Sequence, residues 1–499
     1  MTRTIKRDIP GIDIFKFLMA LAVVLDHFAA IFLPDENAIP VAIRWAMKGP
    51  VPFFFITTGF LTYGIFDDKE KLLRRGLRPM ACKSGPDYID PMFHSRVLGA
   101  QSCNLDLFFF SPDTARNLLA ENAGQADVTV LEGAMGYYDG IAMGTDASAY
   151  ALAAATQTPA VLVVDGRGRA LSAAAEVRGF QSFRQPSGIA GVILNRVSAM
   201  LYPRLAETIT RETGLPVFGF LPVMADCALQ SRHLGLVTAA EIADLQQKLD
   251  KMAQQAEKTV DLDGLLALAR RAPELEKSPV SLPVVPGRPR IAVAKDKAFC
   301  FYYEASLEVL RDLGAELVAF SPLYDETLPR QIQGLYLGGG YPELYARELA
   351  ENETMRRSVY NAVTGGMPTV AECGGFLYLH RTLQDEAGKP WPMTGCLDAE
   401  GYPTGKLSRF GYVTLTAETD SLLFRRGETM PAHEFHYWDS TAPGAAFTAR
   451  KPQSERHWMA GVATDSLYAG FPHFHFAAKP EAARRFVEAA AAYGKKQNT

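Results

Sequence analysis

The 499-residue chain is poor in cysteine, with six in all and no two in a CxxC pair. Zinc ribbons and disulfide frameworks need cysteines at defined close spacings, so this distribution argues against both and suits a reducing cytoplasm. A cleavable signal peptide, with its short apolar core and small-residue cleavage site, is also missing from the sequence. We therefore expect a cytoplasmic protein without a disulfide framework.

A strong charge of one sign is missing as well. The chain has 51 basic and 55 acidic residues, for a net charge of −4. This balance gives no general attraction to nucleic acid or to an anionic membrane, and we expect no nucleic-acid partner. Hydrophobic residues make up 48% of the chain and charged residues 21%, which is typical of α/β proteins. The length predicts two or three domains.

The N-terminal segment differs from the rest because it is strongly apolar. Ile12–Leu33 is about long enough to cross a bilayer, and a second apolar run follows at Pro50–Phe66. Lys16, Asp26 and His27 interrupt the first run. A charge near mid-membrane costs about 2.5–3.5 kcal/mol on insertion scales. Two interpretations stay open: a membrane tether, or a pair of buried helices in a soluble domain.

This segment resembles the start of the integral-membrane acyltransferases that modify surface sugars. The matching residues are Asp13, His27, the triplet Phe53–Phe55 and the pair Gly59-Phe60. The resemblance covers only about the first 66 residues, whereas that family needs many more membrane spans, so no complete acyltransferase is present. We favour a chimera or misassembled reading frame joined near Asp67–Leu72, which sequencing the source DNA would test.

Further along the chain, Met367–Leu379 has the pattern of a nucleophile elbow. An apolar strand at Pro368–Ala371 leads to Cys373, two glycines follow, and a helix is predicted over Phe376–Leu383. The helix N-terminus behind the cysteine would favour a thiolate. The alternative is a buried structural cysteine, which is the commoner fate of a single cysteine.

Two other stretches supply what a nucleophilic cysteine needs. The glycine run that ends GLYLGGG offers the backbone N–H groups of Gly339 and Gly340, and Gly374 would complete an oxyanion hole. Near the C-terminus, His473 and His475 are candidate bases and would face the same side of a strand. An HxH pair also suits a metal, but no cluster supplies a third ligand.

The middle of the chain predicts a parallel sheet covered by helices on both faces, because short apolar runs alternate with helical segments. The predicted strands are Val128–Leu131, Pro159–Asp165, Gly191–Asn195 and Val217–Leu221. Ligands of such sheets sit beyond the carboxyl ends of the strands. Glu132, Asp165 and Asn195 stand at those ends, as binding residues or merely as polar strand ends.

Several motifs together carry a second resemblance. KSGPDYIDPMFH, VLEGAMGYYDG, VLVVDGRG and GVILNRV resemble the cobyrinic acid a,c-diamide synthase family, whose N-terminal half is an ATP-dependent amidoligase related to dethiobiotin synthetase. LGGGYPE, AECGGFLYL, SRFGYV, AHEFHY and YAGFPHFHF resemble the class I glutamine amidotransferase domain of the cobyrinic and cobyric acid synthase group, over Pro289–Ala490.

The resemblance implies an α/β protein with two doubly wound, mostly parallel-sheet domains. A dethiobiotin-synthetase-like amidoligase would span residues 71–272, and a class I glutaminase residues 290–499. A Pro-rich linker at 273–289 would join them, and the apolar helical segment 1–70 would precede them.

The resemblance also implies roles for individual residues. Cys373 would be the nucleophile and His473 its base. Many class I glutaminases carry a Glu two residues after this His, and His475 stands there, so the third triad member is open. ATP and Mg²⁺ would be the cofactors, with Glu132 on the metal. Lys83 would lie near nucleotide phosphates or substrate, Asn195 near the adenine, and the substrate would meet Asp87, Tyr88 and Asp90.

The implied reaction is the ATP- and glutamine-dependent amidation of the a and c carboxylates of cobyrinic acid, in cobalamin biosynthesis. Hydrogenobyrinic acid or nickel sirohydrochlorin are alternative substrates. The Gly-rich loop ending in GKT or GKS that opens this family is absent before Leu72, which leaves a glutaminase without ligase activity as another alternative. A non-catalytic, membrane-tethered binding protein is a further one.

Overall fold

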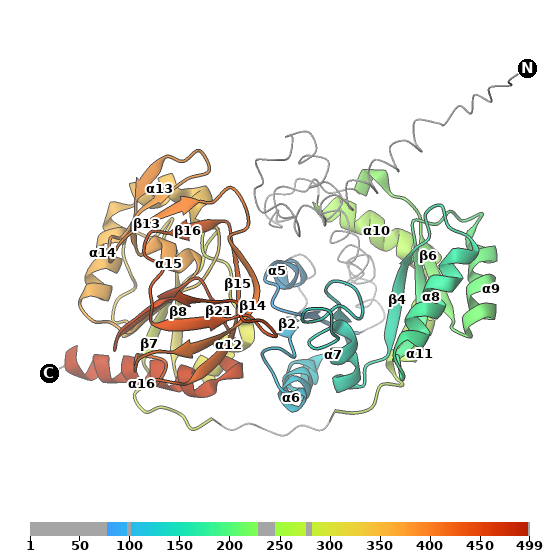
Figure 1. Ribbon diagram of the computed structural model, residues 1–499, viewed down its shortest axis with the longest axis horizontal. Coiled ribbons are helices and arrows are strands. Elements are labelled where there is room, and N and C mark those ends of the chain that lie inside the picture. The colour runs from blue at the N-terminus through green and yellow to red at the C-terminus, as the bar shows by residue number, and fades with distance from the viewer. Residues whose placement is uncertain (1–76, 97–100, 228–244, 276–281, 498–499) are drawn as a thin grey trace, which may run out of the picture. The chain divides into compact units, whose positions relative to one another are not determined.

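A computed structural model describes residues 77–96, 101–227, 245–275 and 282–497 (Figure 1). The apolar N-terminal segment, with the acyltransferase-like residues Asp13, His27, Phe53–Phe55 and Gly59-Phe60, lies outside the described residues. Within those four ranges, every helix is too short or too polar to span a bilayer.

The chain divides into two compact units. The first includes Val161–Arg184 and Ile189–Leu265, and the second includes Gly76–Ala160, Gln185–Gly188 and Leu266–Thr499. The boundaries predicted from sequence, after residues 70, 272 and 289, stay a prediction.

The first unit is built on a three-stranded sheet in the order β4-β5-β6. Its strands and helices are β4 (Ala160–Asp165), α8 (Leu171–Phe183), β5 (Ile189–Asn195), α9 (Tyr202–Thr213), β6 (Val217–Leu221), α10 (Leu245–Thr259) and α11 (Leu262–Ala269). The apolar run of β5 is almost fully buried, which is why a continuous apolar segment forms a strand here. β5 and β6 are parallel, as predicted.

The second unit begins with a parallel three-stranded sheet in the order β2-β1-β3. Its elements are β1 (Pro79–Ser84), α5 (Ile89–Arg96), β2 (Gln101–Leu105), α6 (Pro112–Asn122), β3 (Val128–Glu132) and α7 (Ala149–Thr156). The register pairs Lys83 with Glu132 and thereby places two strand-end side chains together.

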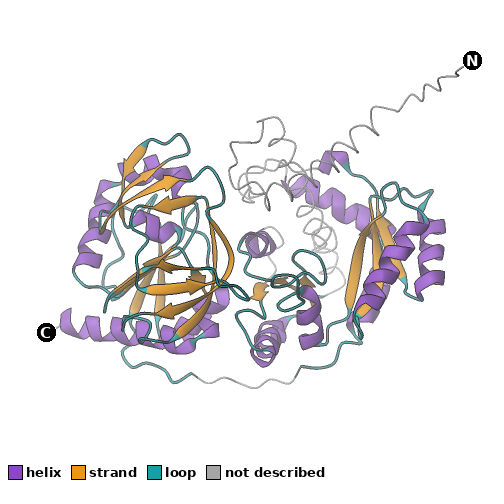
Figure 2. Ribbon diagram, in the orientation of Figure 1, coloured by secondary structure: helices purple, strands orange, loops and turns teal. Residues whose placement is uncertain are grey.

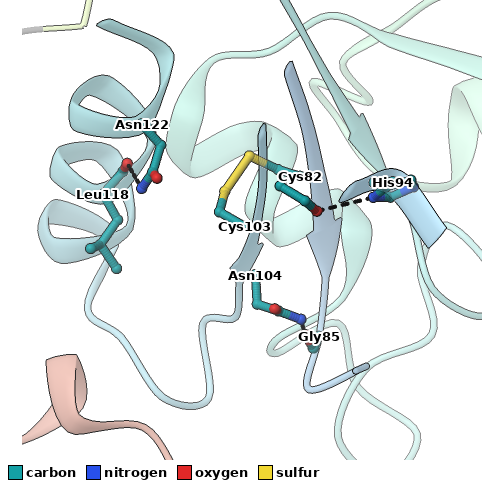
Figure 3. Close-up of a disulfide and its surroundings, with 8 residues drawn as sticks. Cys82, Gly85, His94, Cys103, Asn104, Leu118 and Asn122 are labelled. Carbon is teal, nitrogen blue, oxygen red and sulfur yellow. Dashed lines mark hydrogen bonds between the residues drawn. A yellow bond between two sulfur atoms is a disulfide. The ribbon is translucent and has the colours of Figure 1, made fainter. Parts of the chain in front are cut away.

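One disulfide joins the first two strands of this sheet. Cys82 and Cys103 are register partners on β1 and β2, and their sulfur atoms are bonded (Figure 3). The cysteine spacing predicted no disulfide framework, and for this pair the prediction was wrong. The two residues are 21 apart in sequence, and only the strand register brings them side by side.

The C-terminal part of the second unit contains a six-stranded sheet in the order β19-β20-β10-β9-β7-β8. Its strands are β7 (Arg290–Ala294), β8 (Glu316–Phe320), β9 (Gly334–Leu337), β10 (Thr369–Glu372), β19 (Val462–Ala463) and β20 (Leu467–Gly470). All neighbours pair in parallel except β19, and the helices are α12 (Glu304–Asp312), α13 (Ala346–Glu351), α14 (Glu353–Thr364) and α16 (Pro480–Gln497). The strand expected at Pro368–Ala371 is confirmed, shifted by one residue, in β10.

Two further sheets, which the sequence analysis missed, contain antiparallel pairs (Figure 2). One has the order β12-β11-β13-β16, with β11 (His380–Gln384), β12 (Pro390–Pro392), β13 (Leu397–Pro403) and β16 (Trp438–Ser440). The other has the order β18-β17-β14-β15-β21, with β14 (Arg409–Ala417), β15 (Thr429–His436), β17 (Phe447–Arg450), β18 (His457–Ala460) and β21 (His473–Phe474). Alternate residues of β15 are buried, and Met430 and Ala432 join one hydrophobic core.

Candidate active site

The turn at Cys373 has the geometry that the sequence predicted. β10 ends at Glu372, Cys373 has a φ of +46°, and the helix α15 (Gly374–Tyr378) begins directly after it. A positive φ is uncommon for a residue with a side chain and is often found at functional sites. A Cβ atom at Gly375 would lie 2.1 Å from the carbonyl oxygen of Leu337, so only glycine fits there. The strand–turn–helix prediction is confirmed.

The helix behind Cys373 is shorter than predicted. It has five residues and ends at Tyr378, and β11 occupies most of the range in which Phe376–Leu383 was expected to continue as helix. The pairing of β11 with β12 and β13 overrides the local helical pattern. Phe376 to Tyr378 are helical, so the prediction was right for that turn and wrong from His380 onward.

The surroundings of Cys373 disfavour the charged form of its thiol. Burial raises the pKa of its thiol, and the carboxylate of Glu343 raises it further, while the N–H of Gly374 opposes them. Burial also raises the pKa of Glu343 to about 8, so its charge is present in the alkaline range where the thiol would ionise. The N–H of Gly374, at the helix N-terminus, favours the thiolate as predicted, but burial outweighs it, so a base is needed to remove the thiol proton.

The glycine loop after β9 approaches this turn. The N–H of Gly338 donates to the hydroxyl of Tyr302 at 2.8 Å, Gly339 forms an antiparallel bridge with Phe301, and the N–H of Gly340 has no hydrogen bond to another backbone group of the described residues. A Cβ atom at Gly374 would lie 3.0 Å from the backbone nitrogen of Gly340. The loop and the start of α15 therefore bring backbone donors together, as an oxyanion hole requires.

Strand pairing brings His473 to the same place. Gly470 on β20 is the register partner of Glu372, and its carbonyl accepts the N–H of Cys373 at 2.7 Å. The chain reaches His473 three residues later. A Cβ atom at Gly339 would lie 2.5 Å from Cε1 of His473, so the ring rests directly on the glycine loop. The structure thus gathers the predicted nucleophile turn, donors and base.

Two further side chains flank His473. The carboxylate of Glu372 lies with Oε2 3.7 Å from Nδ1 of the imidazole, and both residues are almost fully buried. The ring of Tyr88 lies close to two other rings. Its centroid is 5.2 Å from that of His473 and 4.4 Å from that of Tyr303. The resemblance implied that Tyr88 faces substrate, and the structure places it beside the predicted base. Glu372 was missed, because no local pattern shows which way a strand-end side chain points.

His475 does not orient His473. Its Nδ1 accepts the N–H of Ala477 at 3.1 Å and lies 3.2 Å from the hydroxyl of Ser306. Its ring stacks on Tyr303, and burial lowers its pKa to about 3, so the imidazole is neutral. A neutral ring carries no negative charge with which to replace the expected Glu.

A second cluster of buried charges surrounds Lys83. Its Nζ lies 2.5 Å from Oδ2 of Asp90 and 3.0 Å from Oε1 of Glu132, and Nε2 of His94 lies 3.1 Å from Oε2 of Glu132. Burial disfavours the charged lysine, but Asp90 and Glu132 outweigh it and raise the pKa of Lys83. Burial, with the nearby charge of Asp87, raises the pKa of Asp90 to about 7. His94 was missed, since only the fold brings α5 against the end of β3.

This cluster does not fit the predicted Mg²⁺ ligand. Both oxygens of Glu132 already have partners, Lys83 on one and His94 on the other. Oδ1 of Asp87 accepts the N–H groups of Ile89 at 2.7 Å and Asp90 at 3.3 Å. Across the described ranges no group of three or more His, Cys, Asp and Glu side chains is arranged to hold a metal. Carboxylates suit Mg²⁺ chemically, but these oxygens are engaged.

Asn195 and Asp165 belong to the first unit. Asn195 ends β5, and its carbonyl accepts the N–H of Gly166 at 2.9 Å. The guanidinium of Arg196 donates to Oδ1 of Asp165 at 2.9 Å. Glu132 ends a strand of a different sheet, so the expected meeting of these strand ends stays a prediction.

Comparisons with known proteins agree with this geometry. Residues 290–481 match the CobB/CobQ-like glutamine amidotransferase domain, and residues 111–231 match an AAA domain. The first match spans the Cys373 turn, the glycine loop and His473.

Curated relatives align with most of the chain. A cobyrinate a,c-diamide synthase from Caldanaerobacter subterraneus is 40% identical over 83% of this chain and 92% of its own length. The cobyrinate a,c-diamide synthase of Thermoplasma volcanium is 38% identical over 85% of this chain and 93% of its own length. That of Salmonella typhimurium is 39% identical over 84% of this chain and 93% of its own length. The chain belongs to the cobyrinate a,c-diamide synthase family.

Proposed function

We propose that this protein uses glutamine and ATP to amidate the a and c side-chain carboxylates of cobyrinic acid. The relatives are named cobyrinate a,c-diamide synthase, and this name identifies cobyrinate as the substrate and its a,c-diamide as the product. The structural observation that carries the proposal is the convergence at Cys373: a positive-φ turn, the backbone N–H of Gly340 close to Gly374, and His473 seated on the glycine loop. These parts suit acyl transfer from an amide to a thiol.

The glutaminase half follows from these residues. His473 takes the proton of the Cys373 thiol, which then attacks the side-chain carbonyl carbon of glutamine. The N–H groups of Gly339, Gly340 and Gly374 stabilise the oxyanion. The carbon–nitrogen bond breaks, and ammonia leaves with the proton that His473 held. Water then attacks the thioester, again with His473 as base, and the products are glutamate and the restored thiol.

In the ligase half, a substrate carboxylate is activated with ATP, and ammonia replaces the phosphate to form an amide. We assign nucleotide contacts to Lys83 and Asn195 and contacts to the corrinoid to Asp87, Tyr88 and Asp90. We route no step through Mg²⁺, because the oxygens of Glu132 are engaged by Lys83 and His94.

The test measures two reactions of the purified protein, glutamine hydrolysis and ATP-dependent amidation of cobyrinic acid. We expect Cys373→Ala to abolish hydrolysis and glutamine-dependent amidation, and to leave amidation with added ammonium ions intact. Hydrolysis that survives the substitution would overturn the assignment of the nucleophile. Hydrogenobyrinic acid and nickel sirohydrochlorin, assayed in parallel, identify the macrocycle.

A second candidate is a glutaminase without ligase activity. The observation that favours it is the missing Gly-rich GKT or GKS loop in residues 1–72. Under this alternative the protein hydrolyses glutamine, but forms no amide from ATP, cobyrinic acid and ammonium. Amide formation under those conditions rules it out.

A further inference from the structure

We propose that Glu372, the residue directly before the nucleophile, is the carboxylate that positions His473. The inference rests on the proposed function, since it assigns a helper to the base of that reaction. It fills the place of the third triad member, where the chain carries His475 two residues after His473.

The first argument is geometric. Oε2 of Glu372 lies 3.7 Å from Nδ1 of His473, and both residues are only 2% exposed. Nδ1 has no hydrogen-bond partner among the described residues. Hydrogen bonds of this kind form at about 2.7–3.2 Å, so a movement of under about 1 Å would close the gap. Such bonds are often long without substrate and tighten when the complex forms.

The second argument concerns how Glu372 is held. Oε1 lies 3.5 Å from the N–H of Phe474, the residue after His473, and Oε2 lies 3.4 Å from the hydroxyl of Tyr336. These contacts aim the carboxylate at the edge of the imidazole. They also tie it to the strand that carries the base, so the two side chains move together.

The third argument is one of charge. A buried carboxylate is costly unless a cation or several hydrogen bonds offset its lost hydration. No lysine or arginine of the described ranges forms an ion pair with Glu372, and His473 is its one ionisable base. The imidazole becomes that cation when it takes the thiol proton. Glu372 therefore stabilises the charge that develops during the reaction.

Other groups around His473 do not serve this purpose. His433 is its register partner across β15 and β21, and burial, with the charge of His473 itself, lowers the pKa of His433 to about 3. The ring of Tyr88 lies tilted beside that of His473, and burial raises the pKa of its phenol. Both groups are neutral at pH 7, and His475 is neutral too.

The test is Glu372→Gln, which keeps the shape and removes the charge. We expect kcat for glutamine hydrolysis to fall about 10²-fold, at the lower end of acid–base effects, with KM for glutamine changed by less than about threefold. The acid limb of the pH–rate profile should move to lower pH, because the protonated imidazole loses its carboxylate. Glu372→Asp should restore part of kcat, and amidation with added ammonium should stay within about twofold, since it bypasses this site.

A matched control is Glu434→Gln. Glu434 is equally buried, and its Oε2 lies 3.5 Å from Nε2 of His436. The substitution removes the same charge from another buried Glu–His pair. We expect the acid limb of the pH–rate profile for glutamine hydrolysis to stay at the same pH as in the unchanged protein.

Three outcomes would overturn the inference: an unchanged kcat in Glu372→Gln, an acid limb that moves equally in Glu434→Gln, or loss of ammonium-dependent amidation together with hydrolysis. Failure of the proposed function looks different, because hydrolysis would then survive Cys373→Ala. If the unchanged protein forms no amide from ammonium, the ligase half fails and the Glu372 comparison still stands on glutamine hydrolysis and its pH profile.

Discussion

The region around Lys83 and the region around Cys373 both bury carboxylates, but they balance the charge differently. Glu132 and Asp90 contact the Lys83 ammonium directly, and Glu132 also contacts His94. Glu372 has no lysine or arginine partner within the described residues and faces the imidazole of His473 instead.

This difference separates a permanent charge cluster from one that forms during catalysis. The Lys83 ammonium is charged at any physiological pH, so its cluster is balanced in the resting protein. In the region of Cys373, burial disfavours the thiolate, and in the proposed mechanism an ion pair forms when His473 takes the thiol proton. Removing a side chain should therefore affect folding more in the first region and catalysis more in the second.

The largest expected effect is on stability. Lys83→Met leaves Asp90 and Glu132 buried without their ammonium, and we expect the free energy of unfolding to fall by about 3–5 kcal/mol. Cys373→Ala removes a neutral side chain and should cost less than about 2 kcal/mol. Urea denaturation of both variants measures the difference, and equal losses would refute the contrast between the two regions.

The next effect is catalytic. A methyl group at Gly339 would meet the ring of His473, so Gly339→Ala should displace the base and reduce glutamine hydrolysis about 10²-fold. The control is Gly179→Ala on helix α8, where the added methyl group meets nothing within 4 Å. Steady-state assays should show a loss only for Gly339→Ala, and normal hydrolysis by that variant would contradict the seating of His473 on the loop.

A smaller effect concerns thiol reactivity. Because the raised pKa of Cys373 keeps the thiol protonated below the alkaline range, iodoacetamide should alkylate it at pH 7 at least about tenfold more slowly than a free thiol with a pKa of about 8.5. The alkylation rate of Cys373 should continue to rise above about pH 8.5, where a free thiol is already largely ionised. Peptide mass spectrometry separates Cys373 from the other cysteines, and fast alkylation at pH 7 would show a preformed thiolate.

The smallest effect concerns a third way of balancing a carboxylate, the ion pair between Glu428 and Arg485. A hydrogen bond from Arg485 lowers the pKa of Glu428 to about 2. A lowered pKa adds stability above the ordinary glutamate value of about 4.3, and that stability is lost as the pH falls towards 2. Because both side chains of this pair still reach solvent, with 17% and 27% of their surface exposed, Glu428→Gln should cost only about 0.5–1 kcal/mol at pH 7 and nothing near pH 2. Urea denaturation at both pH values checks this, and an equal cost at both would contradict the ion-pair origin.

Local patterns in the sequence were sufficient for much of the fold. The apolar runs of β3, β4, β5 and β6 are strands at or within one or two residues of the predicted bounds, because a buried parallel strand leaves a continuous apolar signature. The antiparallel sheets gave weaker signals. β11 carried a helical pattern and became a strand through its pairing with β12 and β13.

For the active site, the sequence by itself determined the candidate nucleophile, the glycine donors and two candidate bases, because a turn before two glycines and an HxH pair are local features. The tertiary structure alone decided their partners. Strand pairing brought Glu372 close to His473, joined Cys82 to Cys103 and set Lys83 beside Glu132, and the packing of helix α5 added His94. These contacts link residues far apart in the chain, and burial, which sets the pKa of Cys373, exists only once the sheets have packed.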